Sequence, residues 1–442
     1  MSIVLIASDR LTLGEVAHLL NQEGVTVHAC SLEAQLKCLS DESFEKAVLI
    51  VPQHGAGAQI EKVRSAFGAG RRLLLCSPQP SNADRQLLLE LGTDEIITPR
   101  TWHPAHITER ILGQLILERD IQPSSYGRLQ GATKAMRNLY QDIETVSPLS
   151  DTILILGETG TGKELIAREI HRLSGRSDSF IALNCAELSV ELSGSDLFGH
   201  KKGSFTGATE ARHGLLAEAG RGTVFFDEIG EFDLTAQAKL LRVLEDKTVR
   251  RVGSNTWETI HARFILATNR DLEGECQTGT FRTDLFHRIN DLTLKTVPLR
   301  EHLSDIPLLV EHFVAEFNQE HNRSLRVPLS ALDRLFDYQW PGNVRELRGI
   351  VRKAAAYADQ TEYINAVRLQ EATMHRLHNK PLKNSVEFDV ASDKWRDVLY
   401  RAQSAYFTAL INASGGNKEE AAKRAGLSRS QLYEKLKEIN SK

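Results

Sequence analysis

The segment from Gly157 to Glu164 reads Gly-Glu-Thr-Gly-Thr-Gly-Lys-Glu and combines three glycines with one lysine. It follows the apolar run 153–156 and precedes a helical pattern over residues 165–173. A strand, a glycine-rich loop and a helix in this order are what a phosphate-binding loop requires. Glycines let backbone N–H groups approach phosphate oxygens, while the helix N-terminus and the Lys163 ammonium attract their charge. The residues of the predicted loop are Gly157, Glu158, Thr159, Gly160, Thr161, Gly162, Lys163 and Glu164.

Two carboxylates end a second apolar run, because residues 222–226 lead into Asp227 and Glu228. In a nucleotide site Asp227 would hold Mg²⁺, directly or through water, and Glu228 would orient and polarise the attacking water. A third apolar run, residues 264–267, is followed shortly by Asn269, and a polar group there can reach the γ-phosphate or the water. Together these segments predict a site that hydrolyses a nucleoside triphosphate.

Each of these segments also has a simpler interpretation. The loop 157–164 could be a glycine-rich turn that caps a helix, and the carboxylates could end a solvated strand. Glu164 is also unusual, because a Ser or Thr at that position normally helps to hold Mg²⁺. The presence of both segments in one chain favours the nucleotide site.

A third candidate segment, residues 197–208, has the composition of a loop tip. Glycines flank the single aromatic residue Phe205, and Lys201 and Lys202 precede it. An exposed aromatic side chain between glycines suits a movable contact with a partner. The alternative is a glycine-rich connector whose phenylalanine packs locally.

The last part of the chain predicts a helix-turn-helix. A short helix over 418–425 is followed by a turn at Gly426-Leu427, and Ser428 with Gln431 forms a capping box for the next helix. Residues 415–442 contain seven Lys or Arg and four Glu, so their net charge is +3, whereas the whole chain has −4. This local positive charge favours DNA binding, with a small helical dimerisation cap as the alternative. The predicted DNA-binding residues are Lys418, Arg424, Ser428, Arg429, Ser430, Gln431, Tyr433 and Lys435.

The elements that position these residues follow from the apolar pattern. Residues 1–120 alternate short apolar runs with helical patterns, which predicts a doubly wound parallel sheet of the flavodoxin-like type. We therefore expect an α/β protein with an all-α C-terminal part. The expected domains are residues 1–122, residues 128–375 with a helical lid at about 303–375, and residues 393–442. Ser124–Gly127 is expected to be a linker, and a second boundary is expected near Asn379–Ser392.

The composition is that of a globular protein, with 41% hydrophobic and 25% charged residues in a chain of 442. The five cysteines are scattered without a C-x-x-C pair, and we interpret them as reduced thiols of a cytoplasmic protein. The N-terminus lacks the pattern of a signal peptide. No apolar stretch approaches the roughly 20 residues that span a bilayer, so we expect no membrane association.

Residues 1–120 resemble a response-regulator receiver but lack its reactive groups. A working receiver needs an acid pair after strand 1, an aspartate at the end of strand 3 and a lysine after strand 5. Here strand 1 leads into Ser8-Asp9, strand 3 ends in Ile50-Val51-Pro52, and strand 5 is followed by Thr98-Pro99-Arg100. Without the aspartate nucleophile no acyl phosphate can form. We interpret residues 1–122 as a pseudo-receiver that serves as a regulatory or dimerisation platform.

Residues 130–375 resemble the central domain of the bacterial enhancer-binding proteins, the NtrC-like AAA+ activators of sigma-54 RNA polymerase. The family loop reads GE[ST]GTGKE, and residues 157–164 match it, Glu164 included. Residues 197–208 resemble the segment that ends in GAFTGA and that grips sigma-54 in the family, with Ser204 as the one exchange. The implied sigma-54 contacts are Gly203, Ser204, Phe205, Thr206, Gly207 and Ala208.

The same resemblance assigns roles to further residues. Residues 281–290 resemble the arginine-finger stretch, so Arg282 and Arg288 are the candidates to reach the γ-phosphate of a neighbouring subunit. Residues 340–347 match the sensor II signature, which implies that Arg345 begins a helix and reaches the nucleotide of its own subunit. Asn269 corresponds to the sensor I residue of AAA+ proteins. Asn184 corresponds to the asparagine that holds the catalytic glutamate in an inactive pose.

The resemblance implies an ATPase that uses ATP and Mg²⁺, assembles from dimers to a hexameric ring, and opens sigma-54 promoters. The C-terminal residues resemble the Fis-type domain and imply binding to upstream, enhancer-like DNA. A second hypothesis is a DNA-binding regulator that works with another sigma factor and uses the ATPase fold for assembly or ligand sensing. A cyclic dinucleotide is one such ligand, although Arg128 and Arg168 are better explained as structural ion pairs. A third hypothesis, an AAA+ enzyme acting on an unrelated protein, does not account for the helix-turn-helix.

Overall fold

The computed structural model describes most of residues 2–358. The described ranges are 2–7, 9–31, 46–51, 57–67, 72–77, 95–97, 103–118, 121, 124–187, 197–201, 212–251, 253–332, 335–358 and 363–364, with isolated positions between 403 and 432. The chain divides into two units, Met1–Gln370 and Glu371–Lys442. None of the helices in the described part of the chain has both the length and the apolar character that crossing a bilayer requires.

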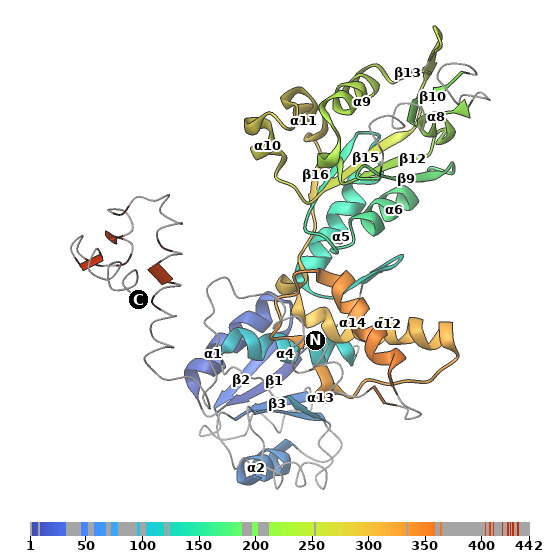
Figure 1. Ribbon diagram of the computed structural model, residues 1–442. Coiled ribbons are helices and arrows are strands. Elements are labelled where there is room, and N and C mark those ends of the chain that lie inside the picture. Colours follow the sequence, from blue (N-terminus) through green and yellow to red (C-terminus); the bar gives the residue numbers. More distant parts are fainter. Residues whose placement is uncertain are drawn as a thin grey trace. The chain divides into compact units, whose positions relative to one another are not determined.

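The first sheet is parallel, with the strand order β2-β1-β3-β4-β5 that is typical of flavodoxin-like folds, as predicted. Strands β1, β3 and β4 are mostly apolar and buried on both faces. Alternate residues of these three strands enter two cores, one shared with α1 and α4 and the other with α2 (Figure 1). The elements are β1 (Ser2–Ala7), α1 (Arg10–Gln22), β2 (Thr26–Ser31), β3 (Lys46–Ile50), α2 (Gly57–Phe67), β4 (Arg72–Cys76), β5 (Glu95–Ile97) and α4 (Pro104–Leu117).

The second sheet is also parallel and has the order β16-β8-β15-β12-β9. One face packs against α5 and α6, and the other against α9, α10 and α11 (Figure 1). The strands are β8 (Ile153–Leu156), β9 (Phe180–Asn184), β12 (Thr223–Asp227), β15 (Arg263–Thr268) and β16 (Thr293–Lys295). The helices are α5 (Lys134–Val146), α6 (Lys163–Leu173), α9 (Leu234–Asp246), α10 (Leu272–Thr278) and α11 (Thr283–Ile289).

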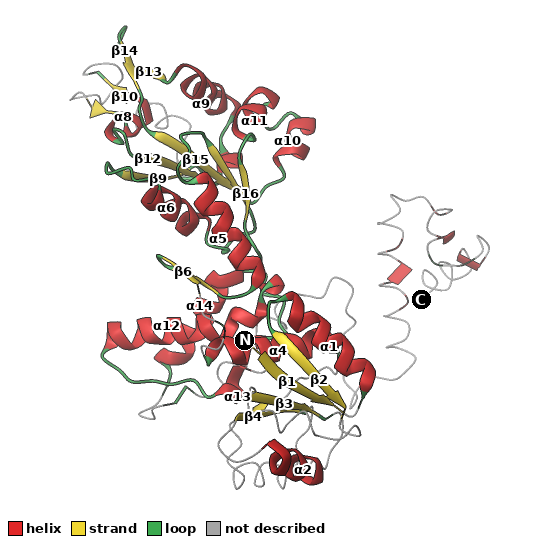
Figure 2. Cartoon of the chain, turned by 180° about the vertical axis from the view of Figure 1, so that it is seen from behind, coloured by secondary structure: helices red, strands yellow, loops and turns green. Residues whose placement is uncertain are grey.

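A helical lid follows the second sheet, and its first element begins at Leu299, shortly before the predicted start at about residue 303. Its two long helices, α12 and α14, lie side by side (Figures 1 and 2). The lid elements are η3 (Leu299–Glu301), η4 (Leu303–Asp305), α12 (Ile306–His321), α13 (Leu329–Leu332) and α14 (Asn343–Ala356). Shorter elements of the ATPase part are α8 (Leu215–Glu218) and η2 (Ile229–Glu231), and the paired strands β10 (Gly199–His200) with β11 (Arg212–His213) and β13 (Thr248–Arg250) with β14 (Trp257–Thr259).

Two predictions about the connections and cysteines were wrong. The expected linker Ser124–Gly127 contains strand β6 (Ser124–Tyr126), which pairs antiparallel with β7 (Leu129–Gly131). The hairpin forms because Gly127 takes a φ of +58°, so the chain can reverse between Tyr126 and Leu129. Cys30 is disulfide-bonded, contrary to the expectation that all cysteines are reduced, whereas Cys76, Cys185 and Cys276 are free.

Candidate functional site

The glycine-rich loop lies between β8 and α6, as predicted, and its glycines are required by close approaches from the lid side. Gly160 has a φ of +83°, and a Cβ there would lie 2.3 Å from the carbonyl oxygen of Gly342. A Cβ at Gly157 would lie 1.7 Å from Oγ1 of Thr296. Only glycine fits either position, so these residues let the loop backbone face a nucleotide while the lid packs behind it.

Lys163 begins α6 at the end of this loop and is almost completely buried, with 6% of the residue exposed. Its Nζ donates to the Gly157 carbonyl at 3.0 Å and lies 3.4 Å from Oε1 of Glu228. The ammonium therefore sits between the phosphate-binding loop and the carboxylate that ends β12. This is the place from which one cation can contact phosphate oxygens on one side and the hydrolytic carboxylate on the other.

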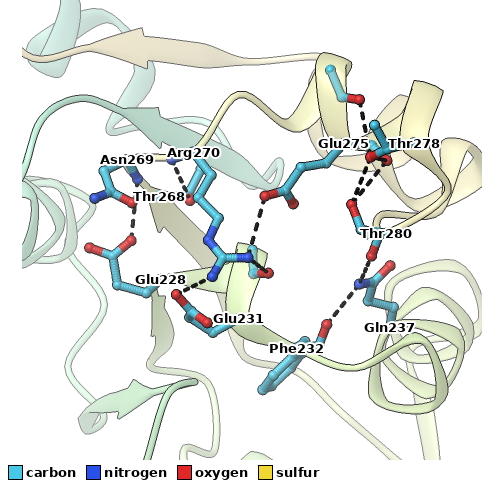
Figure 3. A network of polar contacts seen from close by, with 12 residues as sticks. Glu228, Glu231, Phe232, Gln237, Thr268, Asn269, Arg270, Glu275, Thr278 and Thr280 are labelled. Atoms are coloured by element: carbon cyan, nitrogen blue, oxygen red, sulfur yellow. Dashed lines mark hydrogen bonds and ion pairs between the residues drawn. The ribbon is translucent and has the colours of Figure 1, made fainter. Parts of the chain in front are cut away.

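Glu228 is held on its other side by Asn269. The backbone N–H of Asn269 donates to Oε2 of Glu228 at 3.2 Å (Figure 3), and its Nδ2 donates to Oγ1 of Thr159 at 2.9 Å. Glu228 itself has a φ of +55°, a left-handed conformation that costs energy for a residue with a side chain. Asn269 thus connects the third strand end to both the loop and the carboxylate, which places it where a sensor of the γ-phosphate is expected.

Asp227 carries the features of a cation ligand. Burial raises the pKa of its carboxyl, and the neighbouring Glu228 carboxylate raises this pKa further. Two adjacent carboxylates in a partly buried place repel each other, and a divalent cation relieves that repulsion. The oxygen donors and their charge therefore fit Mg²⁺, whose other ligands would be phosphate oxygens and water.

Two lid residues that sequence reasoning missed hold the outer side of the loop. Asn343 is fully buried, and its Nδ2 donates to Oε2 of Glu158 and to the Thr159 carbonyl, both at 3.1 Å. Arg300 pairs with the same glutamate, with Nη2 at 2.7 Å from Oε1, and this hydrogen-bonded ion pair lowers the pKa of Glu158. Asn343 lies in the segment 340–347 that matches the sensor II signature, directly after Pro341-Gly342, and this polar residue was the available signal.

Arg345 lies in the first turn of α14, as predicted, and its backbone N–H donates to the Gly160 carbonyl at 3.2 Å. It lines a cavity of about 480 Å³ together with residues 159–164, Asp227 and Glu228. The volume is in the range of small-molecule and cofactor sites. Apolar side chains that could receive a flat base line the same cavity, and they are Leu129, Met136, Leu139, Val297 and Phe313.

The candidate arginine fingers lie outside the residues that line this cavity. Arg282 is the N-cap residue of α11 and forms an ion pair with Asp284 at 2.6 Å. Arg288 donates from Nη2 to the Leu244 carbonyl at 3.2 Å. Both guanidinium groups remain 40% exposed, which leaves them accessible to another subunit.

Asn184 lies at the end of β9, directly beside Asp227 in the sheet. Its Nδ2 donates to Oε1 of Glu187 at 2.7 Å. Among the contacts of the described residues, the Glu228 carboxylate is held by Lys163 and Asn269, so the expected link between Asn184 and Glu228 stays a prediction.

The structure describes little of the two predicted partner surfaces. The segment Gly203–Ala208 lies outside the described residues, but the pairing of Gly199 with His213 holds its two flanks together. In the C-terminal unit, Phe407, Ala422 and Leu432 form a small buried cluster. Of the predicted DNA-binding residues, Lys418 and Gln431 are described, both in helical conformation. Those outside the described residues are Arg424, Ser428, Arg429, Ser430, Tyr433 and Lys435.

Among the described residues of the first sheet, no carboxylate lies where a receiver accepts phosphate, at the end of β3. Asp9 caps α1, accepting from the backbone N–H groups of Leu11 and Thr12, and its hydrogen bond with the Thr12 hydroxyl lowers the pKa of the Asp9 carboxyl. Strand β3 ends in apolar residues, and the segments after β3 and β5 lie outside the described residues.

Arg128 and Arg168 form ion pairs, as the sequence reasoning expected. Arg128 lies 4.0 Å from the carboxylate of Glu316, and Arg168 lies 2.7 Å from that of Glu164. Each arginine therefore already has an acidic partner within the chain.

Comparison with known families agrees with this geometry over most of the chain. The family described as Sigma-54 interaction domain matches residues 129–295. The AAA+ ATPase lid domain matches residues 300–385, and the Bacterial regulatory protein, Fis family, matches residues 403–438.

Curated relatives and solved structures show the same similarity. The chain is 40% identical over 310 residues to the transcriptional regulatory protein ZraR of Salmonella typhi, covering 69% of this chain and 67% of that protein. It is 45% identical over 230 residues to the Nif-specific regulatory protein of Azotobacter vinelandii, covering 52% of this chain and 44% of that protein. The crystal structures of NtrX from Brucella abortus with ADP and with ATP are each 27% identical, cover 99% of both chains, and give TM-scores of 0.53 and 0.51. The chain therefore belongs to the NtrC-like family of AAA+ transcriptional activators, with a sigma-54 interaction domain, a helical lid and a Fis-type helix-turn-helix.

Proposed function

We propose that this protein hydrolyses ATP, binds upstream DNA, and uses the energy to remodel sigma-54 RNA polymerase holoenzyme so that promoters open. The observation that carries the proposal is the single cavity that unites the glycine-rich loop, Asp227, Glu228 and Arg345. A loop without carboxylates could bind phosphate without hydrolysing it, and the carboxylates without the loop would have no substrate to act on.

The geometry supports a division of labour in hydrolysis. Lys163 would balance the charge of the β- and γ-phosphates, because its buried ammonium is already held by the loop. Glu228 would orient the attacking water, with Asn269 fixing its carboxylate from the opposite side. Asp227 would hold Mg²⁺, which when bound neutralises phosphate charge as it builds up. Arg345 would sense the nucleotide from the lid.

Assembly would complete the site. Arg282 and Arg288 lie outside the cavity of their own subunit and stay partly exposed, so we place one of them against the γ-phosphate of a neighbouring subunit. A subunit interface of this head-to-tail kind closes into a ring, and the family resemblance suggests a hexamer built from dimers. Hydrolysis would then depend on assembly.

Two surfaces would connect the ATPase to transcription. We assign residues Gly203–Ala208 to the sigma-54 contact, because they match the family's GAFTGA segment except at Ser204. The pairing of β10 with β11 brings the two ends of this segment together. Residues 393–442 would bind upstream DNA through the helix-turn-helix. Residues 1–122 would act as a regulatory platform without phosphate transfer, in a protein that works in the cytoplasm.

Promoter opening tests the proposal against the second hypothesis, in which the ATPase fold serves ligand sensing with another sigma factor. The protein would be incubated with ATP, a DNA template and either sigma-54 or sigma-70 holoenzyme, and single-stranded promoter DNA would be detected by permanganate. We expect ATP-dependent opening with sigma-54 holoenzyme only. Opening with sigma-70 holoenzyme alone, whether or not a cyclic dinucleotide is required, would favour the second hypothesis.

A further inference from the structure

Gln237, on helix α9, is a fully buried polar residue for which nucleotide binding gives no reason. Both its amide nitrogen and its carbonyl oxygen nevertheless form hydrogen bonds with the backbone. Nε2 donates to the carbonyls of Phe232 at 2.8 Å and Thr280 at 3.2 Å (Figure 3). Oε1 accepts from the backbone N–H of Arg282 at 2.9 Å. A buried amide with all of these bonds fixes the backbone that it contacts, because breaking any one leaves an unpaired polar group.

The contacted backbone is the start of the arginine-bearing helix. Thr280 and Arg282 flank Phe281, whose ring is buried in the core between the sheet and α9. Gln237 binds the chain on both sides of this anchor. Helix α11 begins immediately afterwards, with Arg282 as its N-cap residue and Arg288 in its last turn. The position of both guanidinium groups therefore depends on the Gln237 carboxamide.

The other contact of Gln237 leads back to the hydrolytic carboxylate. Phe232 ends the short segment that starts at Glu228, and Arg270 holds this segment from the opposite side. The Arg270 guanidinium donates to the Gly230 carbonyl at 2.9 Å and forms an ion pair with Glu231. Arg270 directly follows Asn269, whose N–H binds Glu228 (Figure 3).

We propose that Gln237 is a positioning residue for the arginines that act on the neighbouring subunit, and that it links their helix to the Glu228 segment of its own subunit. This inference rests on the proposed function, because it requires a nucleotide site shared between subunits. It predicts that loss of the Gln237 hydrogen bonds slows hydrolysis of the ATP bound to the neighbouring subunit. Nucleotide binding in the subunit's own pocket should stay intact.

Mixing two inactive variants tests this directly. Gln237→Met keeps the volume of the side chain but removes its hydrogen bonds, and we expect its ATPase rate to fall roughly a hundredfold, as for a misplaced catalytic group. Glu228→Gln loses hydrolysis but retains a normal arginine helix. In mixed rings, a Gln237→Met site beside a Glu228→Gln neighbour has both an intact glutamate and intact arginines, which at equal amounts applies to roughly a quarter of the interfaces. We therefore expect ATPase activity to return on mixing.

Three comparisons make the result decisive. The double variant Arg282→Ala/Arg288→Ala lacks the arginines and should also recover when mixed with Glu228→Gln. A mixture of this double variant with Gln237→Met should stay inactive, because both then lack the trans group. Gln277→Met, which changes an exposed glutamine on α10, should leave the rate unchanged. Binding of a fluorescent ATP analogue by Gln237→Met should match the unaltered protein.

If the arginine variant recovers with Glu228→Gln but Gln237→Met does not, the inference is wrong and the proposed function stands. If neither recovers, the arginines do not act between subunits, and that part of the proposed function falls together with the inference. Should Gln237→Met fail to bind the ATP analogue, Gln237→Ala replaces it in the same mixtures, since water can enter the smaller side chain's space and satisfy the freed carbonyls. Recovery itself shows that the variant subunit is folded.

Discussion

The Asn343 side chain joins the lid to the phosphate-binding loop, with Nδ2 at 3.1 Å from both the Glu158 carboxylate and the Thr159 carbonyl. Its Oδ1 also accepts from the backbone N–H of Leu299 at 2.8 Å. One buried amide thus connects the phosphate-binding loop to two segments of the lid, the nearer of which begins at Leu299, 44 residues before Asn343. Any movement of the lid changes the geometry of the loop through this residue.

Asn343→Gly should weaken nucleotide binding about tenfold, since it removes these bonds from a buried site. Glycine is chosen because Asn343 has a φ of +49°, which alanine would resist. The affinity for a fluorescent ATP analogue is the measurement. Asn322→Gly is a matched control, because Asn322 has a φ of +50° and is exposed at the end of α12. Equal affinities for the two variants would contradict the role of Asn343.

Lys163→Ala should abolish measurable binding of the same analogue. The lysine is the cation that faces both the loop carbonyl of Gly157 and the carboxylate of Glu228, so its loss also leaves that carboxylate to repel phosphate. Retained binding at the affinity of the unaltered protein would remove Lys163 from the site.

Glu228→Gln should bind ATP but stall. The amide keeps the shape of the side chain and cannot polarise water as a carboxylate does, so turnover should fall by at least about a hundredfold. Phosphate release and analogue binding would be measured on the same sample. Glu245→Gln, on the exposed side of α9, should keep normal turnover. Unchanged turnover in Glu228→Gln would refute the role given to this residue.

Replacement of Arg263 should lower the stability of the fold without a direct effect on ATP hydrolysis. This buried arginine, whose pKa is lowered to about 10 by burial, donates to the carbonyls of Val146, Ser147 and Asp151 and so closes the C-terminal end of α5. Arg263→Met should lower the free energy of unfolding by roughly 3 kcal/mol, because one buried and two partly buried carbonyls lose their donor. Urea unfolding would measure the change, with the exposed Arg326→Met as a control expected within about 0.5 kcal/mol. A change as small as that of the control would show that water replaces the guanidinium.

Thr206→Ala should uncouple ATP hydrolysis from promoter opening. The residue lies in the segment assigned to sigma-54 and not in any of the nucleotide-binding motifs, so hydrolysis should continue while promoter opening is lost. Ser204→Ala, in the same segment, restores the residue of the related family and should preserve opening. Promoter opening by Thr206→Ala at the normal rate would remove this loop from the account.

The strands and the order of motifs could be predicted because they depend on local patterns. Buried parallel strands are continuous apolar runs, and β8, β12 and β15 appear where residues 153–156, 222–226 and 264–267 indicated them. The hairpin at Ser124–Gly131 was missed because its signal, one glycine with positive φ, is weak in a polar stretch.

The contacts that complete the site could not be predicted from local patterns. Most partners that give Asn343 and Gln237 their roles are 43 to 185 residues away, and a buried amide has no signature of its own in the sequence. The choice between Arg282 and Arg288 depends on a neighbouring subunit, and both stay candidates.

Trapping with sigma-54 tests the central claim most directly. The purified protein would be mixed with sigma-54 and ADP–aluminium fluoride, which imitates ATP at the transition state, and analysed by native gel and size exclusion. We predict a stable complex that forms only with the trapped nucleotide and is lost in Thr206→Ala. An absent complex, from protein that hydrolyses ATP in the same buffer, would contradict the claim that this ATPase acts on sigma-54.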